Sequence, residues 1–193
     1  MLRVSNLVSS NMDIININNK NSLNEAAEIL KANGILVFPT DTVYGIGCAL
    51  NEKAIKKLYK IKNRPQNKPT AILMTEKYYD HKIADYFKKY KKGQATLVLN
   101  KKLLDFDIPS IITKDNKIGI RNPNLKWLED LIDLTGPIVA SSANRQGEPT
   151  PSNFKNLDSI IIDEADLVIK SHIELNGTPS MVFDIEENKI IRP

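Results

Sequence analysis

Three cations lie close together in a short segment that two prolines keep stiff. Lys62, Arg64 and Lys68 occur within seven residues, and Pro65 and Pro69 restrict the backbone around them. Ammonium and guanidinium groups held in this way can bind the phosphates of a nucleotide without a glycine-rich P-loop. The sequence contains no P-loop motif, which excludes a Walker-type ATPase. The segment therefore indicates an anion site, with a solvated basic loop as the structural alternative.

A second polar cluster follows the apolar run 35–38, which is typical of a buried strand. Thr40, Asp41, Thr42 and Tyr44 supply two hydroxyls, a carboxylate and a phenol, and the glycines that follow permit close approach to the backbone. A turn in which Asp41 accepts hydrogen bonds from backbone amides is the alternative. Ligands of α/β sheets collect at the carboxyl ends of strands, so this segment is a candidate binding site.

A third cluster follows the apolar run 138–140. Ser142 and Asn144 stand at the end of this expected strand, where small polar side chains can line a tight pocket or simply form a turn. The surroundings of Ser142 do not match a nucleophile elbow, and histidines are few, so we do not expect a serine triad.

Arginine is scarce in this lysine-rich chain, which makes its positions informative. Arg121 ends the apolar segment 117–121, where it could pair a substrate carboxylate bidentately or form a surface ion pair. Ser180 precedes another expected strand, and Arg192 follows the last one.

The composition of the chain excludes several classes of site. The 193 residues include one cysteine and two histidines, His81 and His172, which are far apart. An internal disulfide is impossible, and the sequence predicts no metal site of its own. The net charge of +4 comes almost wholly from lysine, so it is only a weak indication of RNA binding.

No membrane association is expected. The sequence has no apolar run near the roughly 20 residues that a bilayer span needs. The first six residues lack the apolar core of a signal peptide. We therefore expect a cytoplasmic protein.

Strand and helix patterns alternate along the chain, which predicts an α/β fold. Consecutive strands near the C-terminus favour an open mixed sheet with parallel and antiparallel pairs. No repeat or linker divides the sequence, so we predict one domain over 1–193 with its core from about residue 12. The expected strands are 12–17, 35–38, 70–74, 95–99, 117–121, 138–140, 166–170, 181–185 and 189–192, and the expected helices begin near residues 22 and 52 and cover 78–90, 125–134 and 153–160.

Three residues are expected to fix the ends of these elements. Ser22, with Glu25 three residues later, has the spacing of a capping box. Asn51 can cap the second helix. Pro39 is expected to stop the strand before it.

Together these motifs resemble one known family more specifically than any of them does alone. They have the order and spacing of the YrdC-like family, the threonylcarbamoyl-AMP synthases. The similarity runs from about residue 12 to 193 and is that of the short, single-domain form. The matching residues are the segment 40–45, Lys62, Arg64, Ser142, Asn144 and Ser180.

The resemblance implies an enzyme that converts L-threonine, bicarbonate and ATP into threonylcarbamoyl-AMP and pyrophosphate. It implies nucleotidyl transfer, Mg²⁺ that enters with ATP, and use of the product for the t6A modification of tRNA. The implied partner is a tRNA threonylcarbamoyltransferase complex. The implied fold is an open twisted α/β sheet with flanking helices around a positively charged cavity.

The resemblance also implies roles for individual residues. The catalytic residues would be Lys62, Arg64, Ser142 and Asn144. The ATP-binding residues would be Lys62, Arg64, Lys68, Ser142, Asn144, Thr150, Ser152 and Arg192. The threonine-binding residues would be Thr40, Thr42, Tyr44, Arg121 and Ser180, with Arg121 on the carboxylate.

One segment departs from the family pattern. The family usually has Trp-Pro-Gly-Pro-x-Thr before the middle strand, where this chain reads Lys-Lys-Gly-Gln-Ala-Thr over 91–96. Only Gly93 and Thr96 remain, so an aromatic anchor and two rigid prolines are lost beside the cavity.

Two other functions stay open on the sequence alone. The first is an RNA-binding or ribosome-maturation protein, although no surface with interleaved aromatic and basic residues is evident. The second is a carbamoyl-transfer domain of the hydrogenase-maturation type, which normally accompanies acylphosphatase and zinc-finger segments that this chain lacks.

Overall fold

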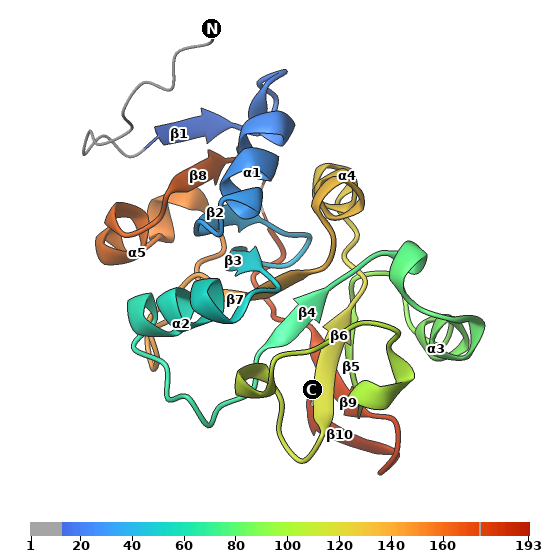
Figure 1. Cartoon of the computed structure of the whole chain (residues 1–193). Helices are drawn as coiled ribbons and strands as arrows, with labels where there is room; N and C mark the ends of the chain where they lie inside the picture. Colours follow the sequence, from blue (N-terminus) through green and yellow to red (C-terminus); the bar gives the residue numbers. More distant parts are fainter. Residues whose placement is uncertain (1–12, 174) are drawn as a thin grey trace, which may run out of the picture.

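A single mixed sheet forms the body of the protein (Figure 1). The structure is a computed structural model that describes residues 13–173 and 175–193. Over these residues ten strands pair in the order β1-β8-β2-β3-β7-β4-β6-β5-β9-β10, with parallel and antiparallel neighbours. This confirms the predicted fold class. The strands are β1 (Asp13–Asn16), β2 (Leu36–Pro39), β3 (Tyr44–Ala49), β4 (Ala71–Leu73), β5 (Ala95–Asn100), β6 (Lys117–Arg121), β7 (Ile138–Ser142), β8 (Leu167–Lys170), β9 (Met181–Asp184) and β10 (Lys189–Arg192).

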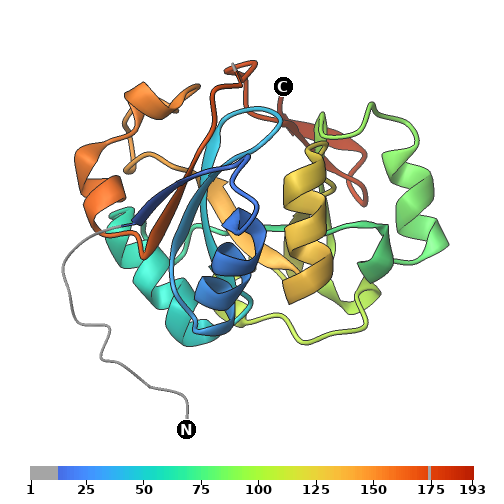
Figure 2. The ribbon, with the colours of Figure 1, turned by 90° about the horizontal axis from the view of Figure 1, so that it is seen from above.

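The helices cover the two faces of the sheet unequally. α1 (Ser22–Lys31) and α4 (Lys126–Thr135) lie side by side on one face, as Figure 2 shows in blue and yellow. α2 (Glu52–Ile61) and α3 (His81–Phe87) pack on the opposite face, and α5 (Ser159–Asp163) leads into β8. Every helix in the described residues is too short or too polar to cross a bilayer.

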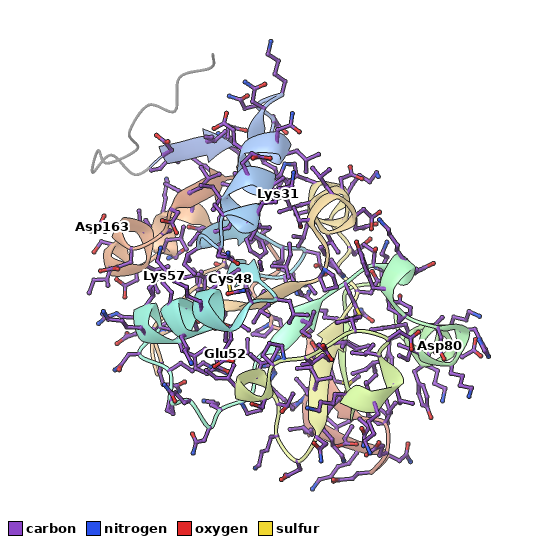
Figure 3. The ribbon with its side chains drawn as sticks, in the orientation of Figure 1. Lys31, Cys48, Glu52, Lys57, Asp80 and Asp163 are labelled. Atoms are coloured by element: carbon purple, nitrogen blue, oxygen red, sulfur yellow. The ribbon has the colours of Figure 1, made fainter. Side chains whose placement is uncertain are left out.

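The core against α2 is apolar. Ala54, Ile55 and Leu58 point from α2 toward the sheet and are almost fully buried. Cys48 projects from β3 into the same layer (Figure 3), where burial raises the pKa of its thiol to about 12. This thiol is therefore a core side chain and not a nucleophile. Asn51 caps α2 as expected, because its side chain accepts from the amides of residues 53 and 54.

The expected capping box at Ser22 is wrong. Ser22 is already inside α1, and the helix begins after Asn21. The Ser22 hydroxyl instead donates to the carbonyl of Ile17 at 2.9 Å and accepts from Trp127 Nε1 at 3.0 Å. A tertiary contact with α4 therefore takes the hydroxyl that the spacing assigned to a local cap.

The sequence interpretation missed β3. No strand was expected over 44–49, but this segment turns back and pairs antiparallel with β2, in which Pro39 is the last residue and lies opposite Tyr44. Glycine lowers strand propensity, which hides this strand in the sequence. The glycines are needed because neighbouring groups come close: a Cβ on Gly47 would lie 2.7 Å from the carbonyl oxygen of Val139.

Replacing Gly47 with alanine is therefore expected to destabilise the protein by about 1–3 kcal/mol, since the added methyl meets backbone and cannot be relieved by a side-chain rotation. Urea unfolding would measure the loss. Gly45→Ala is the matched control, because its Cβ would contact only side chains, at 3.3 Å or more. Equal losses for the two variants would contradict the backbone clash at residue 47.

Most other elements lie close to their expected positions, and two expected helices are shorter. The region 78–90 forms α3 after a 3₁₀ turn, and the region 153–160 forms a 3₁₀ turn before α5. Residues 1–12, which include the start of the expected first strand and the segment examined for a signal peptide, lie outside the described residues. One domain over 1–193 stays a prediction.

Candidate active site

A cavity of about 410 Å³ opens on the part of the sheet that α1 and α4 do not cover. Side chains alternate between the two faces of a strand. Every second residue of a strand therefore lines the bottom of the cavity. The lining includes Gly45, Ala71, Gly119 and Ala140, whose small side chains leave space for the cavity above the sheet. The larger side chains between them point into the core on the other face.

The cavity is strongly cationic. Six of its lining residues are lysine or arginine, and among the described residues none that lines it is a carboxylate. The six are Lys62, Arg64, Lys68, Arg121, Arg145 and Arg192. A concave site with one sign of charge concentrates anionic ligands, so the predicted positively charged cavity is present.

Three of these cations, Lys62, Arg64 and Lys68, come from the connection between α2 and β4. Lys62 is the most buried of the three. It is 3% exposed, and its Nζ donates to the carbonyl oxygens of Ser142 and Asn144. Burial, together with the nearby cations Arg64 and Lys68, lowers the pKa of Lys62 to about 7. The ammonium is therefore poised to gain stability from an incoming anion.

Arg64, which is half-buried, and Lys68, which is exposed, line the rim of the same cavity. The Arg64 guanidinium donates to the backbone carbonyls of Lys68 and Pro69, which fixes its direction without an acidic partner in the described residues. Lys68 donates to the side-chain oxygen of Gln146 at 3.1 Å. Both charges remain available for phosphate groups.

Ser142 and Asn144 lie opposite these cations at the end of β7. Their carbonyls hold Lys62, and the Asn144 amide nitrogen donates to the carbonyls of Arg145 and Glu148. Asn144 Oδ1 is buried without a hydrogen-bond partner among the described residues. It is thus free to accept from a ligand.

Thr150 and Ser152 are placed differently from each other. Thr150 lines the cavity, whereas Ser152 lines a neighbouring pocket that also touches Thr150 and Asn144. The structure therefore brings Thr150 to the main cavity and leaves Ser152 beyond it.

Arg121 sits at the end of β6 with almost all of its side chain buried. Its Nε donates to the carbonyl of Gly93 at 3.2 Å, and its Nη2 donates to Asp41 Oδ2 and to Thr42 Oγ1, each at 2.9 Å. Both nitrogens on one edge of the guanidinium are therefore used by the protein. The bidentate contact expected for a substrate carboxylate is not available on that edge.

The hydroxyls expected near Arg121 divide into two groups. Thr40 and Ser180 line the cavity, and Ser180 Oγ lies 2.7 Å from Thr96 Oγ1. Thr42 does not line it; its hydroxyl is 3.0 Å from that of Thr40 and holds Arg121. Arg192 lines the cavity and donates to the carbonyl of Ser180 at 2.6 Å.

The expectation that Tyr44 shapes a ligand pocket is wrong for this structure. Strand alternation sends Gly45 to the cavity and Tyr44 to the opposite face, where its ring is fully buried. The phenol accepts from the amide of Ser171 at 2.8 Å. Tyr44 therefore ties β3 to the segment after β8.

Some polar lining residues received no ligand role from the sequence, among them Thr96, Ser141 and Arg145. Thr96 lies directly opposite Arg121 on the neighbouring strand, so strand register would have revealed it. Ser141 Oγ is buried without a partner among the described residues. Arg145 pairs with Asp158 at 2.6 Å, and the scarcity of arginine was a usable signal for it.

The described residues contain no group of three or more His, Cys, Asp or Glu side chains that could hold a metal ion. The chemistry that the arrangement supports is the binding and charge stabilisation of a polyphosphate beside a carboxylate-bearing molecule.

Comparison with known proteins gives a consistent result. The model of the Sua5/YciO/YrdC family, described as "Telomere recombination", matches residues 28–193. A protein of Methanocaldococcus jannaschii named "Putative threonylcarbamoyl-AMP synthase" is 35% identical over 165 residues, which cover 81% of this chain and 77% of that protein. The threonylcarbamoyl-AMP synthase of Pseudomonas fluorescens Pf0-1 is 26% identical, over 88% of this chain and 95% of the relative.

A solved structure agrees with these relatives. Sua5 of Pyrococcus abyssi, crystallised with L-threonine, superimposes with a TM-score of 0.82 at 28% identity. The match covers 93% of this chain and 57% of that one. The fold, the motifs and the family model all agree, and the chain therefore belongs to the Sua5/YciO/YrdC family.

Proposed function

We propose that this protein is an L-threonylcarbamoyladenylate synthase, which makes threonylcarbamoyl-AMP and pyrophosphate from L-threonine, bicarbonate and ATP. The observation that carries the proposal is one cavity with two groups of cations. Lys62, Arg64 and Lys68 come from the α2–β4 connection, whereas Arg121 and Arg192 come from the strands beyond it. The names of the relatives and the threonine bound to Sua5 support the same substrates.

The proposed reaction needs charge stabilisation more than a nucleophilic side chain. The threonine amine adds to bicarbonate or CO₂ to give a carbamate. A carbamate oxygen then attacks the α-phosphorus of ATP, and the bond to pyrophosphate breaks. Lys62 and Arg64 would hold the phosphate oxygens as charge moves onto the leaving group. The unpartnered Oδ1 of Asn144 would accept a hydrogen bond from a hydroxyl or amine of the nucleotide. The reaction is a nucleotidyl transfer.

Magnesium would enter as part of the ATP substrate. Mg²⁺ prefers oxygen ligands and retains several waters, so triphosphate oxygens and water can coordinate it without protein carboxylates.

The product would serve the t6A modification of tRNA. Threonylcarbamoyl-AMP is a mixed anhydride, which is unstable in water and needs a nearby acceptor. We expect a tRNA threonylcarbamoyltransferase complex to accept it in the cytoplasm. Weak RNA binding by the cationic rim stays a prediction.

The deciding experiment is pyrophosphate release by the purified protein with ATP, Mg²⁺ and bicarbonate, with and without L-threonine. Release that requires both threonine and bicarbonate would support the synthase. Release that is indifferent to threonine, or none at all, would overturn it. In that case salt-dependent RNA affinity or transfer from carbamoyl phosphate would distinguish the RNA-binding and carbamoyl-transfer alternatives.

Lys62 should make ATP binding depend on pH. Its pKa of about 7 in the free protein means that most of the amine is neutral at pH 8. The polyphosphate favours the charged form, so binding at pH 8 should take up about one proton, and ATP affinity should fall as the pH rises above about 7.

Calorimetry at pH 8 in buffers of different ionisation enthalpy measures this uptake. Lys62→Met should abolish it, whereas Lys60→Met, on the exposed face of α2, should leave it unchanged. The same uptake in Lys62→Met and the wild type would exclude Lys62 as the titrating group.

A further inference from the structure

The protein holds Arg121 so that one nitrogen remains for a ligand. Nε and Nη2 donate to the Gly93 carbonyl, Asp41 Oδ2 and Thr42 Oγ1. Among the described residues, Nη1 has no hydrogen-bond partner. A carboxylate that approaches from the cavity would therefore meet the guanidinium through a single nitrogen, with Thr96 beside it as a further donor.

The Asp41 carboxylate packs directly against Gly93, next to this guanidinium. Gly93 has a φ of +82°, and a Cβ placed on it would lie 2.0 Å from Asp41 Oδ2. The Asp41 carboxylate thus occupies the space that a side chain at residue 93 would take. Any other residue at position 93 would push the carboxylate away from Arg121.

This arrangement is unfavourable for stability on its own. Asp41 Oδ1 is buried without a hydrogen-bond partner among the described residues, and the Asp41–Arg121 pair is largely desolvated. An unsatisfied buried acceptor and a buried ion pair both lose solvation that the folded state recovers only in part. A role in binding accounts for them better than a role in stability.

We propose that Asp41 is a positioning residue for substrate binding. Its carboxylate, seated in the space that Gly93 leaves, fixes Arg121 so that Nη1 alone faces the carboxylate of the amino-acid substrate. The link to an amino acid rests on the proposed function. The interlock of Asp41 with Gly93 and Arg121 is a property of the free protein.

The first test therefore uses the protein without substrate. The chain has five arginines, so the Nε–H signals can be resolved by ¹⁵N NMR, and Arg121→Lys would assign the one from Arg121. Exchange of this proton with water should be at least about 10-fold faster in Asp41→Ala and in Gly93→Ala than in the wild type. Without the Asp41 contact to Nη2 the guanidinium can move, and the bond from Nε to the Gly93 carbonyl then opens more often. Unchanged exchange in both variants would overturn the proposal.

The second test separates positioning from general structure. Asp41→Ala and Gly93→Ala should each raise the KM for threonine about 10-fold, with kcat and the KM for ATP within about 2-fold of wild type. The double variant should resemble Asp41→Ala alone, since the two changes remove the same interaction. Asp41→Asn, which keeps one acceptor of the same shape, should recover part of the loss.

Asp184→Asn is the matched control. Asp184 forms a buried ion pair with Lys117 at 2.7 Å, at the other end of β6, and does not line the cavity. This variant should lower the melting temperature and leave the KM for threonine within about 2-fold. If Asp41→Ala lowers kcat or folded yield while the KM for threonine stays unchanged, Asp41 is structural and the proposal fails.

The two proposals can fail separately. If the wild type releases no threonine-dependent pyrophosphate, the proposed function fails, and the exchange measurement still decides whether Asp41 fixes Arg121. If the wild type is active but the variants bind threonine as well as it does, the function stands and the positioning role is overturned.

Discussion

Arg64→Ala is expected to reduce kcat/KM for ATP by about 10²–10³-fold while the fold stays intact, because removing one fixed donor from a developing anion has an effect of this size. Among the described residues, the guanidinium donates to the carbonyls of Lys68 and Pro69, and its carbon lies 5.7 Å from the centre of the Tyr59 ring. These contacts lie at the surface, so the truncation opens no cavity in the core and buries no unpaired charge.

Steady-state kinetics with ATP as the varied substrate measures the loss of kcat/KM. Thermal unfolding shows whether the fold stays intact. Lys60→Ala is the matched control, because it removes one exposed cation near the end of the same helix, away from the cavity. It should change kcat/KM by less than about 2-fold. Full activity in Arg64→Ala would place the triphosphate elsewhere.

Arg121→Lys is expected to raise the KM for threonine about 100-fold and to change the KM for ATP by less than about 3-fold. Lysine keeps a positive charge beside Asp41, but its single ammonium cannot reach Asp41, Thr42 and the Gly93 carbonyl and still offer a donor to the cavity. Alanine is a poorer choice, because it would leave the buried Asp41 carboxylate unpaired at a cost of about 3–5 kcal/mol.

Threonine titration at saturating ATP, and the reverse, would separate the two constants. Lys117→Arg, at the start of the same strand, is the matched control, because it exchanges the same two residue types in the ion pair with Asp184. It should leave both constants within about 2-fold. Equal increases in the KM for threonine and the KM for ATP in Arg121→Lys would exclude Arg121 as the residue that binds the substrate carboxylate.

Part of the candidate site could be predicted from the sequence because short-range spacing defines it. Lys62, Arg64 and Lys68 are neighbours in the chain, and the two prolines keep them together whatever the rest of the fold does. The helix cap at Asn51 is local in the same way. The roles assigned to these residues toward ATP and threonine stay predictions.

The face on which a strand residue lies could not be predicted where the strand itself was missed. No strand was expected over 44–49, and the family resemblance placed Tyr44 beside the ligand, whereas the β2–β3 pairing turns its ring into the core. Ser22 shows the same limit, because a partner 105 residues away takes its hydroxyl from the local cap.

The sequence by itself determined the α/β class, most strand positions and the cationic segment of this protein, since periodicity and local spacing encode them. Only the tertiary structure decided that Lys62 is buried against two carbonyls, that Arg121 keeps one nitrogen without a partner in the described part of the chain, and that Asp41 fills the space at Gly93. These features depend on contacts between segments far apart in the chain. Such contacts set burial, and with it the pKa of Lys62 and the number of donors left for a ligand.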